Sequence, residues 1–309
     1  MRRRSILDAA GVTIAMAIAM LVVLGLTSLA SSAQATFPGR NGLIAFNGAG
    51  IEVMRPDGTH RRQVTGGFSP AFSPNGKRIA FVREVRRQRY KIYVARTDGT
   101  HVHRLIRRPR LRNYWDPAFS PSGRRVAFQG CNRNRECALF VARTDGTEKQ
   151  RLTDYRRAGA DREPDFSPNG RKIAFTGYRR HGVCRIYVMR ADGTDVRALS
   201  DNQQVNSCDS NPSFSPDGTE IAFASRYRSG YPGIWQIHVM NADGTNVRQL
   251  TSIDPGAYLP SFSPSGKRIA FTINYDQYGD PNSIGVMRTD GMGQRDLGNG
   301  HDPSWGVRP

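Results

Sequence analysis

The sequence of 309 residues is poor in the side chains and motifs on which many enzymes depend. It has four cysteines and six histidines, and their spacing matches no standard zinc-binding pattern. No Gly-x-Ser-x-Gly segment occurs, which excludes the nucleophile elbow of the α/β-hydrolases. The EF-hand spacing and the signatures of helix-turn-helix, zinc-finger and RNA-binding modules are absent as well. From local motifs we therefore predict no catalytic residue, no metal site and no cofactor.

Acidic residues are also scarce. The chain has 26 Asp and Glu against 45 Lys and Arg, which leaves a net charge of +19 at pH 7. Such an excess favours attraction to polyanions and says nothing about the fold. We expect salt-sensitive, nonspecific binding to nucleic acid in vitro, and no base-specific recognition.

Only one long apolar run is present, from about residue 9 to residue 30. Three arginines precede it, and Ala33-Gln34-Ala35 follows it, so we predict that residues 1–35 are a signal peptide cleaved after Ala35. The alternative is an uncleaved membrane anchor, because the run can span a bilayer of about 30 Å. Arg3-Arg4 also resembles a twin-arginine export signal, so the export route stays open. Either way the protein is expected to be exported, to the periplasm, the cell envelope or the medium.

One ten-residue segment recurs along the chain. FSPNGKRIAF, residues 72–81, returns with small changes from Phe119, Phe166, Phe214 and Phe262, at intervals of 47 or 48 residues. Asp-Gly recurs in step with it six times and is followed by Thr in the first five cases. A sixth copy of the segment is split, because residues 37–46 keep its second half and residues 302–306 repeat its lead-in. Six repeats are therefore expected to close on themselves.

Each repeat predicts four short strands, because apolar runs rich in Ile, Val, Phe and Tyr are bounded by Pro, Asn, Asp and Gly. In the second repeat we expect strands at residues 69–73, 77–83, 90–96 and 101–106. Ser-Pro-x-Gly supplies the turn between the first two strands, and Asp-Gly the turn between the last two. The two middle strands are apolar at successive positions, so both faces of each sheet must be buried.

Small sheets that repeat with this period predict an all-β fold, a six-bladed β-propeller of four-stranded antiparallel blades. A solenoid would also bury both faces of each sheet, but it needs atypical capping repeats. Here a carboxy-terminal strand is expected to join the amino-terminal blade and close the ring. The propeller is predicted to occupy residues 36–309, with repeats at about 37–64 plus 302–308, 69–106, 116–153, 163–199, 211–251 and 260–297.

The chain resembles the TolB-like propellers built from WD40-like PD40 repeats, whose hallmark is Pro-x-(Phe/Trp)-Ser-Pro-x-Gly-x-x-Ile-Ala-Phe followed by an Asp-Gly turn. The resemblance covers residues 37–308. It implies a six-bladed propeller but no single function, since relatives include periplasmic scaffold proteins and the gating propellers of some serine peptidases. The family's namesake carries an α/β domain ahead of its blades and binds a peptidoglycan-associated lipoprotein. We expect this chain to be the propeller alone, without that domain.

In such a propeller the recurring turns share one face, and the loops that vary between repeats share the other, which we call the variable face. Binding residues usually lie in variable loops on a rigid scaffold. Here these loops combine arginines with aromatic residues, which suits an acidic partner or a polyanion. The alternative is a solvated arginine-rich surface without a partner. The predicted binding residues are Arg86, Arg87, Arg89, Tyr90, Arg107, Arg108, Arg110, Arg112, Tyr114, Trp115, Arg156, Arg157, Arg179 and Arg180.

The four cysteines all fall in loops that we assign to the variable face. Their even number in an exported chain predicts two disulfides between neighbours, Cys131–Cys137 and Cys184–Cys208. The alternative for the second pair is a metal site completed by His181, although the spacing fits no standard zinc site.

Our leading hypothesis is a non-enzymatic scaffold that uses the variable face and the channel mouth to hold an envelope protein or an anionic cell-wall polymer. We expect a monomer, with membrane contact only through an uncleaved amino terminus. The alternative is a propeller enzyme, such as a polysaccharide lyase or hydrolase. Its active site would be assembled at the channel mouth from single residues of different blades and would leave no local motif.

Overall fold

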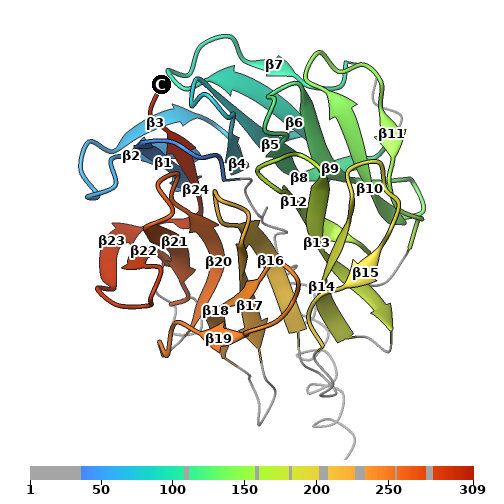
Figure 1. Cartoon of the computed structure of the whole chain (residues 1–309). Helices are drawn as coiled ribbons and strands as arrows, with labels where there is room; N and C mark the ends of the chain where they lie inside the picture. The colour runs from blue at the N-terminus through green and yellow to red at the C-terminus, as the bar shows by residue number, and fades with distance from the viewer. Residues whose placement is uncertain are drawn as a thin grey trace, which may run out of the picture. The chain divides into compact units, whose positions relative to one another are not determined.

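The regular elements of the described chain are all β-strands (Figure 1). The computed structural model describes residues 36–107, 111–156, 160–180, 183–201, 208–226, 234–254, 256–275 and 281–309, without the side chains of residues 179 and 180. They belong to one structural unit, Ser31–Pro309. Within these ranges no segment forms a helix that could serve as a membrane span.

Small antiparallel sheets make up this unit, which is a β-propeller, and four of them have four strands each. The first has the order β24 (His301–Val307), β1 (Asn41–Asn47), β2 (Ile51–Met54), β3 (Arg62–Thr65). The second consists of β4 (Phe68–Phe72), β5 (Arg78–Arg86), β6 (Arg89–Arg96) and β7 (His103–Arg104). The third consists of β8 (Asn113–Phe119), β9 (Arg125–Cys131), β10 (Cys137–Arg143) and β11 (Gln150–Arg151). The fourth consists of β20 (Ala257–Phe262), β21 (Arg268–Ile273), β22 (Ser283–Arg288) and β23 (Arg295–Asn299).

The remaining strands form one eight-stranded sheet in place of two separate four-stranded sheets. They are β12 (Arg162–Phe166), β13 (Lys172–Arg180), β14 (Val183–Arg190), β15 (Arg197–Ala198), β16 (Cys208–Phe214), β17 (Glu220–Arg226), β18 (Trp235–Asn241) and β19 (Arg248–Gln249). A single parallel pair, Cys184 with Cys208, joins β14 to β16, and the same two residues form a disulfide with their Cα atoms 4.6 Å apart. The prediction of six separate sheets is therefore wrong at this junction, because the disulfide holds the two backbones within pairing distance. On either side of it, β12–β15 and β16–β19 keep the antiparallel order of the repeat.

The two ends of the described unit meet in one sheet, as the split repeat predicted. Strand β24 pairs antiparallel with β1, for example Trp305 with Ile44 and Ser304 with Ala45. The same strand packs against β20, β21 and β22 of the preceding sheet. Trp305 is only 2% exposed and lies in one cluster with Ile44, Phe46 and Ile284, so the carboxy-terminal strand is part of the core.

The strands of the second repeat lie close to their predicted positions. Strands β4, β5 and β6 differ from the prediction by one to three residues at their ends, while β7 is reduced to His103–Arg104. His101 has a φ of 55°, and this left-handed residue delays the start of the outer strand. Successive apolar residues of β5, from Ile79 to Val82, are all buried, so both faces of the sheet are covered as expected.

The recurring turns are held by their own side chains. In the Asp-Gly-Thr turn the Asp98 carboxylate accepts hydrogen bonds from the Thr100 peptide N–H at 2.8 Å and from its hydroxyl at 2.7 Å. The Thr100 hydrogen bonds lower the pKa of Asp98. Gly76 in the other turn has a φ of 66°, which glycine adopts without steric cost.

The two kinds of turn lie on the same face of the unit. The Thr97 hydroxyl donates to the Gly76 carbonyl at 2.7 Å, and the Thr97 N–H donates to the Lys77 carbonyl at 3.0 Å. Equivalent bonds recur in the other sheets, such as Thr144 N–H to the Arg124 carbonyl at 2.9 Å. The β5–β6 hairpin and the β7–β8 loop are therefore at the opposite ends of these strands, on the variable face.

Candidate functional site

The described arginines predicted to bind a partner fall into an exposed and a half-buried group. Arg86, Arg87 and Arg89 are exposed on the β5–β6 hairpin, and Arg107 is exposed in the β7–β8 loop. Arg112, later in that loop, is half-buried. None of these five side chains has a hydrogen bond or an ion pair with another described residue. Five guanidinium groups without an anionic partner are therefore gathered in the second repeat and the start of the third, and we call them the free arginines.

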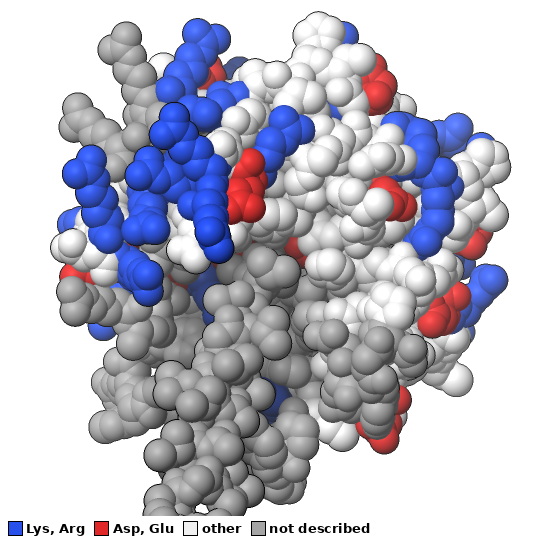
Figure 2. All heavy atoms as spheres, turned by 180° about the vertical axis from the view of Figure 1, so that it is seen from behind, with Lys and Arg blue, Asp and Glu red and all other residues white. Residues whose placement is uncertain are grey.

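Several of the other predicted positions lie beyond what the structure describes. Arg108, Arg110, Arg157 and His181 are outside the described residues, and Arg179 and Arg180 are in β13 with undescribed side chains. Figure 2, the view from behind, shows Lys and Arg side chains gathered at its upper left with fewer Asp and Glu among them.

Three aromatic side chains from three strands of the second and third sheets meet one another. Trp115 of β8 lies with its ring centre 4.2 Å from that of Tyr90 in β6 and 5.8 Å from that of Phe68 in β4. The Phe68 and Tyr90 rings are 5.9 Å apart, at 73° to each other. All three remain partly exposed while they pack against the core, and we call them the aromatic trio.

Tyr114 does not belong to this surface, and its assignment as a binding residue is wrong. It is 1% exposed and packs 5.5 Å from the Phe128 ring, and its hydroxyl accepts a hydrogen bond from the Leu111 N–H at 3.4 Å. Successive side chains of a strand point to opposite faces, so when Trp115 faces outward its neighbour Tyr114 must face inward.

Lys91 of β6 anchors the loop that carries Arg112, a role that the sequence alone did not indicate. Its ammonium donates to the Leu111 carbonyl at 2.9 Å and to the Arg112 carbonyl at 2.6 Å. Burial, with repulsion from Arg104 and Arg89, lowers the pKa of Lys91 to about 8. A lysine inside an otherwise apolar strand was the signal that could have revealed it.

Arg156 lies beside the first disulfide, in the next sheet. The Arg156 N–H donates to the Cys137 carbonyl at 3.0 Å, and the Arg156 carbonyl accepts from the Cys137 N–H at 2.9 Å. The Arg156 side chain is half-buried. Both predicted disulfides are present, Cys131–Cys137 and Cys184–Cys208. The alternative of a metal site at Cys184 and Cys208 is therefore wrong.

One residue of each innermost strand has a left-handed backbone, and the sequence analysis did not single out these six residues. They are Ser69, Asp116, Glu163, Asn211, Leu259 and Asp302, with φ between 52° and 59°, and each stands directly before a proline. Such a conformation costs about 1–3 kcal/mol per residue and persists only where the surrounding structure enforces it. The six strands that carry them, β4, β8, β12, β16, β20 and β24, surround the centre of the unit in Figure 1, and each contacts the next. We call these six residues the collar.

The collar contains three buried carboxylates that face one another. Asp116 and Asp302 are fully buried, Glu163 is 3% exposed, and both Asp116 and Glu163 raise the pKa of Asp302. Burial, followed by repulsion from Glu163, raises the pKa of Asp116 to about 7. Burial also raises the pKa of Asp302 well above its usual range. The collar is therefore a buried cluster in which the protonated forms of Asp116 and Asp302 are favoured.

Hydrogen bonds from backbone N–H groups to side-chain carboxylates link three of the collar residues from strand to strand. The Glu163 N–H donates to Asp116 Oδ2 at 3.3 Å, and the Asn211 N–H donates to Glu163 Oε2 at 3.0 Å. Asp302 in turn accepts from Asn47 Nδ2 at 3.4 Å. Each collar residue stands directly before a proline that the repeats share, while the residue itself differs from repeat to repeat. This pattern was the signal in the sequence that could have pointed to the collar side chains.

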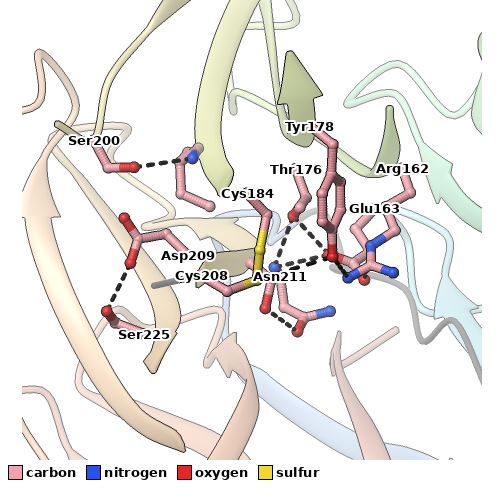
Figure 3. Close-up of a disulfide and its surroundings, with 12 residues drawn as sticks. Arg162, Glu163, Thr176, Tyr178, Cys184, Ser200, Cys208, Asp209, Asn211 and Ser225 are labelled. Atoms are coloured by element: carbon pink, nitrogen blue, oxygen red, sulfur yellow. Dashed lines mark hydrogen bonds and ion pairs between the residues drawn. A yellow bond between two sulfur atoms is a disulfide. The ribbon is translucent and has the colours of Figure 1, made fainter. Parts of the chain in front are cut away.

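Arg162 stands next to the collar but is already engaged. Figure 3 shows it beside the second disulfide, where its Nε lies 3.1 Å from Glu163 Oε1 and its Nη2 donates to the Tyr178 hydroxyl at 2.8 Å. Glu163 also accepts from the Thr176 hydroxyl at 2.6 Å. The Tyr178 oxygen is 3.9 Å from Cys208 Sγ, and burial raises the pKa of Tyr178. This network holds Glu163 in place and leaves Arg162 committed, unlike the free arginines.

No set of three or more His, Cys, Asp or Glu side chains in the described ranges is arranged to hold a metal ion. The groupings with distinct chemistry are thus the free arginines, the aromatic trio and the buried collar. The free arginines can attract anions from solution, whereas burial favours the protonated carboxyl groups of Asp116 and Asp302 in the collar.

Comparison with known proteins agrees with this architecture. A family model described as the TolB beta propeller domain, PD40, matches residues 47–307. The structure is similar to TolB from Acinetobacter baumannii, with a TM-score of 0.72 and 24% identity over 88% of this chain and 68% of that one. It is also similar to a putative TolB from Agrobacterium tumefaciens, with a TM-score of 0.57 and 21% identity over 70% and 80% of the two chains. An oligogalacturonate lyase in complex with manganese gives a TM-score of 0.60 at 16% identity over 87% and 78%. No curated protein matches the sequence.

Proposed function

This chain belongs to the TolB β-propeller family, and we propose that it is an exported, non-enzymatic scaffold whose variable face binds an acidic partner of the cell envelope. The similarity to TolB structures supports a scaffold role. Disulfides persist in oxidising compartments outside the cytoplasm, so the two disulfides of this chain support export. Export is expected whether residues 1–35 are cleaved after Ala35 or stay as an uncleaved anchor. The scaffold acts as a monomer.

We count the eight-stranded sheet as two blades, which makes six in total. The grouping of β12–β15 and β16–β19, each with the strand order of one repeat, supports this count. The pairing of β24 with β1 supports closure of the ring by the carboxy-terminal strand. A closed ring is the rigid frame on which variable loops can hold a binding surface in place.

The observation that carries the proposal is the set of free arginines. Some arginines elsewhere in the described chain are ion-paired, such as Arg143 with Glu148 at 3.1 Å or Arg248 with Glu220 at 3.1 Å, while others, such as Arg124 and Arg171, have no side-chain partner either. The β5–β6 hairpin differs in carrying Arg86, Arg87 and Arg89 within four residues, and its only acidic residue, Glu84, accepts the Gln88 N–H at 2.6 Å. A positive patch of this kind attracts an anionic partner over a range set by salt.

The experiment compares two triple variants of the full chain that lower the net charge equally. The first replaces Arg86, Arg87 and Arg89 with Gln. The control replaces Arg124, Arg171 and Lys267, which are exposed at the recurring turns on the other face and have no side-chain partner.

Binding is measured with poly-glutamate as the acidic probe. We expect the first variant to bind at least about tenfold more weakly than the wild type at low salt, and the control to bind like the wild type. The difference should disappear at 0.5 M salt, where the screening length falls to about 4 Å. Equal losses in both variants would show that net charge acts without a specific face, and no binding by the wild type would refute the function.

The second candidate, a channel-mouth enzyme, remains a prediction. The oligogalacturonate lyase shares the fold with this chain at 16% identity, and a likeness at that level says nothing about substrate or reaction.

A further inference from the structure

Strand β24 is attached to its sheet differently from the other five innermost strands. Strands β4, β8, β12, β16 and β20 each lead through a short recurring turn into the next strand, with which they pair. By contrast, β24 pairs with β1 over a long distance in the chain, since the paired residues Asn47 and His301 are 254 positions apart. No turn ties these two strands together, so the joint depends on the contacts of β24 itself.

Most contacts that hold β24 are neutral and do not change with pH. The Trp305 N–H donates to Ser261 Oγ of β20 at 3.1 Å, and the Phe72 N–H of β4 donates to Ser304 Oγ at 3.2 Å. From β22, the apolar Ile284 packs in one cluster with Trp305. These contacts connect β24 to the sheets on both sides of it.

Asp302 is the exception, because it is a fully buried carboxyl group in this strand. Three uncharged residues bind it from β1, β4 and β21. Asn47 Nδ2 donates to its Oδ2 at 3.4 Å, the Ser69 hydroxyl bonds its carboxylate, and its own N–H donates to Thr272 Oγ1 at 2.9 Å. Within the described residues its Oδ1 has no hydrogen-bond partner. A charged carboxylate is costly in such a place, so burial raises the pKa of Asp302.

The charged groups that act on Asp302 across the collar are acidic. Asp116 of β8 and Glu163 of β12 both raise the pKa of Asp302 by repulsion. Arg162 is ion-paired with Glu163 at 3.1 Å, and the collar residue of β20, Leu259, is apolar. Loss of the Asp302 proton therefore adds a negative charge beside carboxyl groups that already repel it.

Of the strands that carry these three carboxyl groups, β24 is the one that can move away most easily. Asp116 and Glu163 stand in strands that short turns bind to their sheets. Separation of β24 from β1 breaks no such hairpin, and it brings the Asp302 carboxylate into water, where its charge costs least. Repulsion in the collar is thus relieved at one joint of the ring.

We propose that Asp302 makes β24 a pH-sensitive latch of the propeller. While Asp302 is protonated, β24 stays in the first sheet and the ring is closed. When the proton is lost, β24 separates from β1 and the ring opens at this joint, while the other sheets keep their strands paired. This proposal goes beyond the binding function and rests on the proposed closure of the ring by β24.

The test is amide hydrogen exchange of the full chain at pH 5 and pH 8, followed by mass spectrometry of its peptides. Each rate is divided by that of the free peptide at the same pH, which leaves the protection due to structure. We expect the protection of β24 and β1 to fall at least about tenfold from pH 5 to pH 8, as for a shift of about one pKa unit. Protection of β9 and β10 should change less than about twofold.

Variants of the latch identify the titrating group. Asp302→Asn should keep the protection of β24 at pH 8 within about twofold of that at pH 5, because an amide does not titrate. Asparagine tolerates the left-handed backbone, as Asn211 does at a φ of 55°. If near-ultraviolet circular dichroism shows that this variant is not folded, Asp302→Ser replaces it, since Ser69 holds the equivalent place in β4. The exposed control Asp195→Asn should respond to pH like the wild type.

Four results would overturn the latch. An equal fall in β9 and β10 would mean that the whole protein loses stability together. A fall that persists in Asp302→Asn would assign the titration to another group, and one that disappears in His301→Asn would assign it to the neighbouring histidine. If β24 is unprotected even at pH 5, the closure of the ring fails as well, whereas the binding of poly-glutamate is decided separately.

Discussion

Replacing the buried carboxyl of Asp116 by an amide should stabilise the protein at neutral and alkaline pH. Asp116→Asn keeps the size and the Oδ acceptor that receives the Glu163 N–H at 3.3 Å. Asparagine also tolerates the left-handed conformation at this position, where φ is 52°. The chain already has an asparagine at the equivalent collar position in β16, Asn211, with a φ of 55°.

The magnitude follows from the pKa of Asp116. Burial raises it from 3.8 to about 7, whereas the unfolded chain releases this proton near pH 4. Between these values the folded protein binds a proton that the unfolded chain has lost, so stability falls as pH rises from about 4 to about 7. A shift of about 3 pKa units corresponds to at most about 4 kcal/mol. Asn does not titrate, so the variant should match the wild type below pH 4 and exceed its stability by about 1–4 kcal/mol at pH 8.

The assay is urea unfolding of both proteins at intervals from pH 4 to pH 8. Asp165 is buried with a raised pKa in both proteins, so its contribution cancels in the difference between them. Asp116 helps to raise the pKa of Asp302, so the loss of this repulsion in Asp116→Asn adds to the stability gained at high pH. The control is Asp195→Asn, where the aspartate has a φ of 55° but is exposed. If the two stability profiles are parallel from pH 4 to pH 8, or if Asp195→Asn gives the same gain, burial of the Asp116 carboxyl is not the cause.

Two further predictions concern the frame of the propeller. Both Gly146 and Gly123 have positive φ, but a Cβ atom at Gly146 would clash with the Leu105 carbonyl oxygen, whereas at Gly123 it would come no closer than 3.5 Å to Pro74. Gly146→Ala should therefore lower the free energy of unfolding by more than Gly123→Ala, and equal losses in urea unfolding would refute the clash. Replacing Cys184 and Cys208 with Ser should lower the free energy of unfolding by about 3 kcal/mol, because this disulfide closes a loop of 24 residues. Urea unfolding with and without reductant measures the loss, and reductant should have no further effect at this site in the variant. An unchanged urea midpoint in the variant would contradict the estimate.

Much of the fold could be predicted because its instructions are local. Ser-Pro-x-Gly and Asp-Gly-Thr are turns made by consecutive residues, and strands such as Ile79–Val82 are buried on both faces because they are apolar without interruption. The split repeat likewise predicted the pairing of β24 with β1. Among the site residues, the exposure of Arg86, Arg87 and Arg89 followed from their place in a hairpin.

The rest depended on contacts between residues that are distant in the chain. Tyr114 and Trp115 are neighbours with the same aromatic character, and only the register of β8 buries the first and exposes the second. The merging of two sheets at Cys184 and Cys208 required the approach of two strands. The left-handed residues before proline go against the local preference of such positions for extended backbone. The sequence by itself thus determined the repeat and its turns, since these are decided within ten residues, while the tertiary structure decided the acidic collar and the aromatic trio, since their members stand in different repeats and meet only when the strands pack together.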